Sequence, residues 1–256
     1  MITISKEEIM QCYNFATTAW NNKSQSAKQF GTPELREKNA FIADQIFGKL
    51  AEYVFKYTII ALNKSIQVHL DFSHYPDQLH TDNGDVEIIV EGESLPLKID
   101  VKGSSYKAQW LLVEIHKYND PQTGMKVSDR YVMVKFSEKV PDSQTLRNNP
   151  ELILDFSQIE GEVIGWANHS DFSSEKDQKA WFSYDKGQKP YKRKVLPNSS
   201  ERVNNITHLN RYINKVITNN NFSEEEFLLN LPLEAKLNVG LPVSWLYTDL
   251  KKILEL

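Results

Sequence analysis

Residues 84–105, GDVEIIVEGESLPLKIDVKGSS, predict two strands that fold back on each other about Gly92-Glu93. In this register three apolar pairs lie on one face: Val86 with Ile99, Ile88 with Leu97, and Val90 with Leu95. A shift of one residue would break the pattern, because side chains alternate between the faces of a strand. The sequence therefore predicts a hairpin with one buried face.

The opposite face of this hairpin carries charge. Glu87 pairs with Lys98, and Asp85 faces Asp100, with Lys102 two residues further on the same side. Two facing carboxylates repel, and one tends to take up a proton unless a cation lies between them. Mg²⁺ is commonly held by one or two carboxylates, so the pair indicates half of a metal site. The alternative interpretation is ordinary surface charge and turn chemistry at a strand edge.

A long helix is predicted upstream, over residues 32–63, with Thr32 as N-cap, Pro33 in the first turn and apolar residues at helical spacing. Glu52 lies within an apolar stripe of this helix, where a carboxylate is costly unless it is paired or bound to a metal. The alternative is that Glu52 reaches solvent at the edge of the stripe. Gly48, one turn earlier, indicates a close approach of the helix to a sheet.

Three segments, GKLAE ending at Glu52, GDVEI around Asp85, and DVKGS from Asp100, resemble the PD-(D/E)xK nuclease superfamily, which includes many type II restriction endonucleases. The resemblance covers roughly residues 34–140. The chain departs from the family pattern in two places, because Gly84 stands where the family often has Pro, and Asp100 replaces the commoner Glu.

The resemblance implies Mg²⁺-dependent hydrolysis of a phosphodiester. Asp85, Asp100 and the backbone carbonyl of Val101 would hold the metal, and Glu52 would complete its shell directly or through water. The ion would polarise the phosphate and lower the pKa of a bound water. Lys102 would orient that water and stabilise developing negative charge.

Candidate DNA contacts lie further along the chain. Lys107 and Gln109 follow the second strand as weaker candidates, for which a solvated loop is the alternative. Residues 185–194, DKGQKPYKRK, form a basic segment with Tyr184 and Tyr191 interleaved. Its candidates for contact with the phosphate backbone are Lys189, Lys192, Arg193 and Lys194. No residue that would read base edges is identified.

The order of predicted elements indicates an α/β or α+β fold. Strands are predicted within residues 65–72, 130–136 and 161–167, whereas residues 109–118 fit strand or helix equally. Helix starts are predicted at Ser199 or Ser200, at Ser223 and at Ser244, and the Asn-rich residues 204–221 are predicted as helix plus loop. We expect a restriction-endonuclease-like core, a mixed β-sheet flanked by helices, within residues 1–195, and a helical C-terminal region over residues 196–256.

Composition sets further bounds. The 256 residues are 40% hydrophobic and 25% charged, which allows a sizeable core, and the net charge of −4 does not mark a nucleic-acid binder. The single Cys12 excludes a disulfide framework and a Cys-rich zinc site. No signal peptide or membrane-length apolar run is present, so we expect a soluble, cytoplasmic protein.

These features predict a DNA endonuclease, and family analogy favours a type II restriction enzyme that acts as a homodimer on double-stranded DNA. Two alternatives stay open: a structure-selective repair, recombination or phage nuclease of the same fold, and a non-catalytic DNA-binding module. No P-loop, GxSxG elbow or Rossmann fingerprint is present, and the histidines match no nuclease signature.

Overall fold

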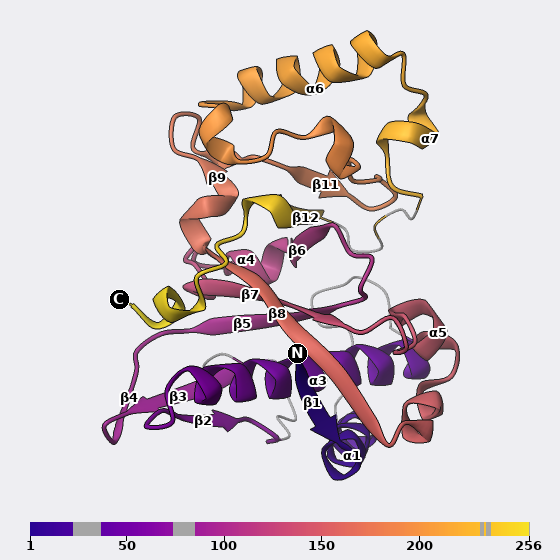
Figure 1. Ribbon diagram of the computed structural model, residues 1–256, viewed down its shortest axis with the longest axis vertical. Coiled ribbons are helices and arrows are strands. Elements are labelled where there is room, and N and C mark those ends of the chain that lie inside the picture. Colours follow the sequence, from indigo (N-terminus) through magenta and orange to yellow (C-terminus); the bar gives the residue numbers. More distant parts are fainter. Residues whose placement is uncertain (23–36, 74–84, 231–232, 234–236, 256) are drawn as a thin grey trace. The chain divides into compact units, whose positions relative to one another are not determined.

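The computed structural model describes residues 1–22, 37–73, 85–230, 233 and 237–255. The chain forms a mixed α+β structure (Figure 1) that divides into two compact units. Unit 1 comprises residues 1–108, 128–166 and 248–256, and unit 2 comprises residues 109–127 and 167–247. The division therefore differs from the boundary near residue 195 that the sequence suggested, because unit 2 is inserted into unit 1 at two places.

Unit 1 contains a four-stranded mixed sheet in the order β1-β8-β7-β5. Its strands are β1 (Ile2–Ser5), β8 (Gln158–Asn168), β7 (Arg130–Phe136) and β5 (Ile99–Ser104). The β1 strand is antiparallel to β8, whereas β5 is parallel to β7. The β5 strand thus forms one edge of the sheet. The strands predicted over residues 130–136 and 161–167 are confirmed as β7 and part of β8.

A second, three-stranded sheet of unit 1 has the order β2-β3-β4. Its strands are β2 (Gln67–Leu70), β3 (Val86–Val90) and β4 (Glu93–Ser94), and β2 confirms the strand predicted within residues 65–72. The helices of this unit are α1 (Lys6–Asn22), α3 (Lys38–Leu62) and α5 (Ser143–Asn148), with 3₁₀ helices η1 (Pro150–Asp155) and η6 (Leu250–Leu254). The α3 helix lies between the two sheets (Figure 1) and supplies much of their shared apolar core.

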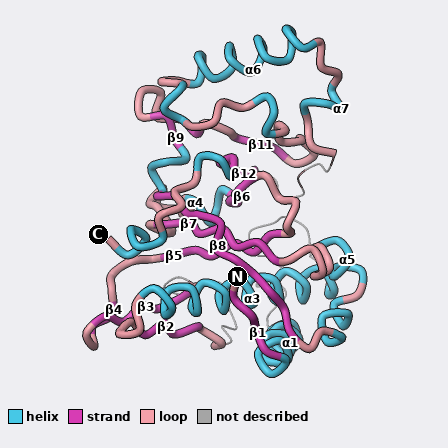
Figure 2. The backbone as a smooth tube through the Cα atoms, in the orientation of Figure 1, coloured by secondary structure: helices cyan, strands magenta, loops and turns pink. Residues whose placement is uncertain are grey.

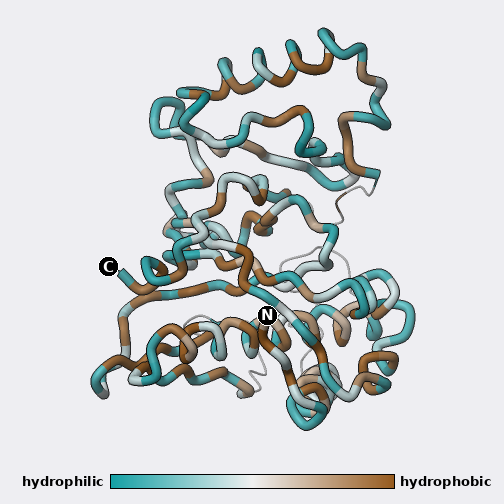
Figure 3. The backbone as a smooth tube through the Cα atoms, in the orientation of Figure 1, coloured by the Kyte–Doolittle hydropathy of each residue, from teal (hydrophilic) through white to brown (hydrophobic). Residues whose placement is uncertain are grey.

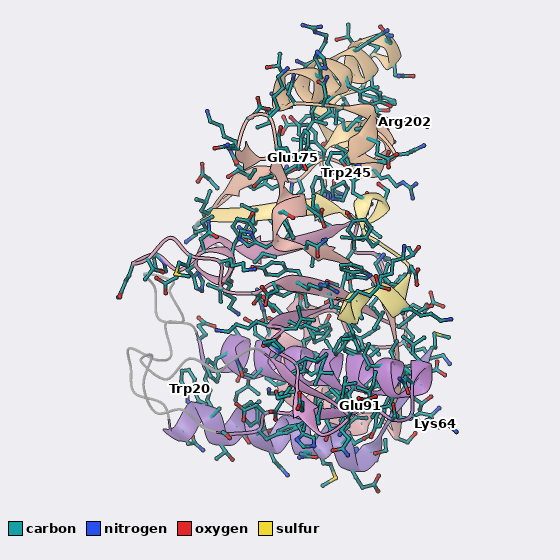
Figure 4. All side chains as sticks on the ribbon, turned by 90° about the vertical axis from the view of Figure 1, so that its left-hand side faces the viewer. Trp20, Lys64, Glu91, Glu175, Arg202 and Trp245 are labelled. Carbon is teal, nitrogen blue, oxygen red and sulfur yellow. The ribbon has the colours of Figure 1, made fainter. Side chains whose placement is uncertain are left out.

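The predicted hairpin register is wrong. Val90 pairs with Glu93 and Ile89 with Ser94, so the turn is Glu91-Gly92, with φ of 53° and 86°. Positive φ at both central residues is the geometry of a type I′ hairpin turn, which matches the twist of the strands. Glu91 is labelled in Figure 4. The pairing ends after Leu95, where Pro96 has no N–H to donate, and the chain leaves to form β5 beside β7.

The α3 helix confirms the prediction of a long helix, although Thr32 and Pro33 lie outside the described residues. The expected close approach at Gly48 is wrong, because among the described residues nothing lies within 4 Å of a Cβ built there. The close approach occurs at Gly103 of β5, where such a Cβ would lie 2.8 Å from the backbone oxygen of Phe47. A glycine in the strand, rather than in the helix, lets α3 pack on the sheet.

Unit 2 is built on a three-stranded sheet in the order β11-β12-β6, with both pairs antiparallel. Its strands are β11 (Ser183–Asp185), β12 (Leu237–Pro242) and β6 (Trp110–Glu114), and β9 (Ser173–Ser174) and β10 (Lys179–Ala180) form a separate ribbon. The helices are α4 (Ile115–Tyr118), α6 (Ile206–Asn220) and α7 (Glu224–Phe227), with 3₁₀ helices η2 (His169–Phe172), η3 (Arg193–Val195), η4 (Ser200–Arg202) and η5 (Val243–Trp245). Residues 109–118, which fit strand or helix, contain both β6 and α4 (Figure 2).

The C-terminal predictions are met in part. The α6 helix, whose residues alternate between apolar and polar (Figure 3), begins after the N-cap Asn205, and α7 begins after Ser223 in a capping box. The predicted helix from Ser244 is wrong, because this stretch forms the separate 3₁₀ helices η5 and η6, and β12 precedes it. The packing of Trp245, which Figure 4 labels, explains why no continuous helix forms here. Its indole N–H donates to the Pro197 carbonyl at 2.9 Å, and its ring packs on Phe182.

None of the helices in the described ranges is long and apolar enough to cross a membrane.

Candidate active site

Asp85 lies along the free edge of β5. Its backbone N–H donates to the Ile99 carbonyl at 3.2 Å, and its carboxylate accepts the Val101 N–H at 2.7 Å. The side chain therefore takes the place of a backbone acceptor that a neighbouring strand would supply. Alternate carbonyls of β5 face this edge, so the Val101 carbonyl points the same way as that of Ile99. The predicted oxygen ligands Asp85 and Val101 are thus adjacent.

Asp100 and Lys102 lie on the same face of β5, as expected for residues two apart in a strand. Lys102 Nζ is 2.7 Å from Asp100 Oδ1, and Asp100 is only 7% exposed. The Asp100 side chain also forms a hydrogen bond with the Asp85 carboxyl. The structure therefore brings together Asp85, Asp100 and Lys102, although the hairpin register that led us to expect this is wrong.

The two carboxyls form a proton-sharing pair. Burial, and then the charge of Asp100, raise the pKa of Asp85 from 3.8 to about 7, while Lys102 and the Val101 N–H act in the opposite direction. Two carboxyls in contact in a buried place cannot both ionise without cost, so one proton is retained near neutral pH. A divalent cation would replace this proton and relieve the same conflict.

Glu52 is placed differently from the expectation. It is 4% exposed, and its Oε2 is 2.8 Å from Nζ of Lys49, one turn earlier on α3. Within the part of the chain that the structure describes, no group of three or more His, Cys, Asp or Glu side chains is arranged to hold a metal ion. Glu52 is therefore not brought into one metal-binding group with Asp85 and Asp100, and Lys49 compensates its charge.

Lys49 lies near the candidate site and was not among the residues predicted from the sequence. Its Nζ lies 5.2 Å and 5.5 Å from the ring centroids of Phe15 and Phe72. Burial lowers the pKa of Lys49, but Glu52, and then Asp85 and Asp71, raise it, so that the net shift is upward. Lys49 thus interacts electrostatically with both Glu52 and Asp85. The i,i+3 spacing of Lys49 and Glu52 is the sequence signal that indicates their pairing.

The two weaker DNA-contact candidates fall in different units. Lys107 of unit 1 is exposed, with Nζ 5.1 Å from the ring centroid of Tyr106, beside a depression that Lys139 and Asp142 also line. Gln109 of unit 2 accepts the backbone N–H of Arg193 at 3.0 Å. Gln109 therefore holds the basic segment in place.

Within residues 185–194, the cations differ in what they contact. Lys189, Arg193 and Lys194 are exposed, and Lys192 is half-buried. Lys192 Nζ donates to the Glu225 carbonyl, and Lys194 Nζ lies 3.9 Å from the ring centroid of Phe222. Lys192 and Lys194 thus contact α7 and the turn before it, although Lys194 stays exposed, like Lys189 and Arg193.

The aromatic residues of this segment do not form an exposed stacking surface. Tyr184 is buried in the core of unit 2, where its ring lies against Trp110, and Tyr191 stacks on Phe227. Both rings stabilise unit 2, so the interpretation of the interleaved tyrosines as part of a DNA-binding surface is not supported by their position.

Comparison of the chain with protein-family models, with curated proteins and with solved structures finds no match. Function is therefore argued from the site itself.

The residues present suit a hard divalent cation in part. Asp85 and Asp100 supply two carboxylates already in contact, and Mg²⁺ is often bound by one or two carboxylates plus waters and substrate phosphate oxygens. Burial and the neighbouring Asp100 raise the pKa of Asp85, and a bound cation would oppose that rise. Lys102 supplies a donor on the same face, so the arrangement places metal-binding oxygens and a cationic hydrogen-bond donor side by side.

Proposed function

We propose that the protein is a Mg²⁺-dependent nuclease of the PD-(D/E)xK type that hydrolyses phosphodiester bonds in double-stranded DNA. The observation that carries this proposal is the contact of Asp85, Asp100 and Lys102 at the edge of β5. A buried pair of acids that share a proton costs stability, and a catalytic role gives a reason for it.

Asp85, Asp100 and the Val101 carbonyl would hold the ion. Mg²⁺ would supply Lewis-acid activation of the phosphate and a bound water of lowered pKa. Lys102 would hold the attacking water in line with the phosphorus and donate to the phosphate oxygens as negative charge develops on them. Glu52 would keep Lys49 in place on α3, and Lys49 would in turn contribute positive charge near Asp85.

The mixed β1-β8-β7-β5 sheet with α3 packed on β5 and β7 supports the proposal at the level of architecture. The exposed cations Lys189, Arg193 and Lys194 are candidates for contact with the DNA backbone. Within this class we propose a type II restriction enzyme that acts as a homodimer, because a two-fold symmetric protein matches a palindromic site.

The test is incubation of the full chain with long unmethylated duplex DNA and Mg²⁺, beside Asp100→Asn and the surface variant Lys98→Gln as a matched control. Lys98 is exposed and lies two residues before Asp100. We expect cleavage by the wild type and Lys98→Gln, and none by Asp100→Asn or in the presence of chelator.

The products separate the alternatives. Discrete fragments support a restriction enzyme, whereas a smear, or cleavage confined to branched or single-stranded substrates, supports a structure-selective nuclease of the same fold. Absence of cleavage of every substrate by the wild type, together with binding of DNA, would overturn the proposal in favour of a non-catalytic DNA-binding module.

A further inference from the structure

Lys135 is the one residue of β7 that is not buried. The β5 and β7 strands are parallel, with Asp100 beside Tyr131, Lys102 beside Met133, and Ser104 beside Lys135. Paired residues of neighbouring strands project to the same face. Lys135 therefore stands on the face of the sheet that carries Asp100 and Lys102, next to Ser104 and diagonal to Lys102.

The opposite face confirms this assignment. A Cβ built on Gly103 would lie 2.8 Å from the Phe47 oxygen of α3 and 3.2 Å from the ring of Phe136. The residues that alternate with Lys102 and Lys135 thus face α3. Lys102, Ser104 and Lys135 consequently form a group of two ammonium groups and a hydroxyl on the other face, and all three residues are half-buried.

Among the described residues, Lys135 has no compensating acid. Across the described residues, its ammonium group makes no hydrogen bond or ion pair. Burial lowers the pKa of Lys135, and no carboxylate of the described residues opposes that shift. The contrast with Lys49 is direct, because Lys49 is more deeply buried but is paired with Glu52. A partly desolvated ammonium group that folding leaves unpaired suits a ligand of opposite charge.

We propose that Lys135, together with Ser104, forms a binding site for a backbone phosphate of the nucleic acid, beside Lys102. This inference rests on the proposed function, which it deepens, because it assigns a further substrate-binding residue beside the catalytic group. Lysine binds phosphate as a point charge with three donors, and the Ser104 hydroxyl adds a fourth. Lys135 would fix the phosphodiester along β5, while Lys102 acts on the scissile phosphate.

The test measures binding of a short DNA duplex in chelator, so that it does not depend on cleavage. The variants are Lys135→Met, Lys135→Arg and the control Lys64→Gln, since Lys64 is exposed in the turn before β2 (Figure 4). We expect Lys135→Met to weaken binding about tenfold or more, which is the effect of losing one charged hydrogen-bond partner. The slope of log K against log salt should fall by about 1. Lys135→Arg should retain most of the affinity, and Lys64→Gln should equal the wild type.

Thermal unfolding separates this role from a structural one. Methionine preserves the aliphatic packing of lysine and removes only the charge, so Lys135→Met should unfold at the wild-type temperature or above. The weakening should be equal for duplexes of unrelated sequence, because a phosphate contact carries no base information.

The inference would be overturned if Lys135→Met bound the duplex with the affinity and salt dependence of the wild type. It would also be overturned if the loss of affinity were confined to one DNA sequence or were explained by lower thermal stability. Failure of the proposed function is a different result, namely the absence of Mg²⁺-dependent cleavage by wild-type protein that still binds the duplex through Lys135.

Discussion

The carboxylate of Asp85 accepts the Val101 N–H at 2.7 Å, and this bond joins the segment that leads into β3 to the edge of β5 in the other sheet. The same contact sets Asp85 beside Asp100. Asp85 therefore both bonds to the edge of β5 and interacts with Asp100 at the candidate active site. The structural role of Asp85 and its proposed catalytic role are thus coupled.

Asp85→Asn should change how stability depends on pH. The pKa of Asp85 is raised on folding, so the folded state binds a proton that the unfolded state releases between about pH 4 and pH 7. In chelator, the free energy of unfolding of the wild type should fall as pH rises through this window, by up to about 4 kcal/mol, and then level off. Asparagine keeps an acceptor for Val101 and stays neutral, so Asp85→Asn should show a much smaller fall.

Urea unfolding at pH 5 and pH 8 measures this difference. At pH 8, saturating Mg²⁺ should raise the free energy of unfolding of the wild type back toward its value at pH 5. It should leave that of Asp85→Asn nearly unchanged, because a ligand stabilises only a folded state that binds it. Parallel pH profiles for the two proteins would show that Asp85 holds no proton in the folded state.

Lys49 and Glu52 should behave as a coupled pair. Either Lys49→Met or Glu52→Gln alone leaves a buried group without its partner and should cost about 3–5 kcal/mol. The double variant Lys49→Met/Glu52→Gln removes both charges, so its loss should be well below the sum of the two single losses.

Cleavage by the double variant then tests whether the pair contributes to catalysis. Retained activity means that neither Glu52 nor the charge of Lys49 is needed, whereas loss of activity at preserved stability means that at least one of the two groups contributes. Additive losses of stability would contradict the pairing.

Gly48 and Gly103 should respond to alanine in opposite directions. Gly48→Ala adds a methyl group where the described residues leave space, and it should stabilise the protein by about 1 kcal/mol through helix propensity. Gly103→Ala drives a Cβ against the Phe47 oxygen and should cost about 1–3 kcal/mol. Denaturant midpoints of the two variants measure this, and a destabilised Gly48→Ala would mean that the helix needs the space at that position.

Lys102→Met should separate chemistry from folding. Lys102 contacts Asp100 at 2.7 Å but is itself partly exposed, so its loss should lower stability without preventing folding. At saturating DNA and Mg²⁺ we expect the cleavage rate to fall about 10²–10³-fold, the usual effect of removing one donor to developing charge. Lys98→Gln should cleave at the wild-type rate. An equal rate for Lys102→Met would remove Lys102 from the mechanism.

Local patterns predicted several elements correctly. The apolar spacing of α3, the apolar run of β7 and the capping box of α7 each depend on residues close in sequence, where periodicity and caps act directly. The β12 strand was missed, because its Gly240 and Pro242 weaken strand propensity and only pairing with β6 and β11 stabilises it. The helix expected after Ser244 was lost to the packing of Trp245 in the core of unit 2.

The sequence by itself determined which residues compose the candidate site, since Asp85, Asp100 and Lys102 follow from strand alternation and a short motif. Only the tertiary structure decided how they meet: β5 pairs with β7 instead of completing the hairpin, and Asp85 bonds to its free edge. The tertiary structure also paired Glu52 with Lys49 and placed Lys135 beside Ser104. Alternation is a property of neighbouring residues, whereas strand partners and buried ion pairs depend on contacts between segments far apart in the chain.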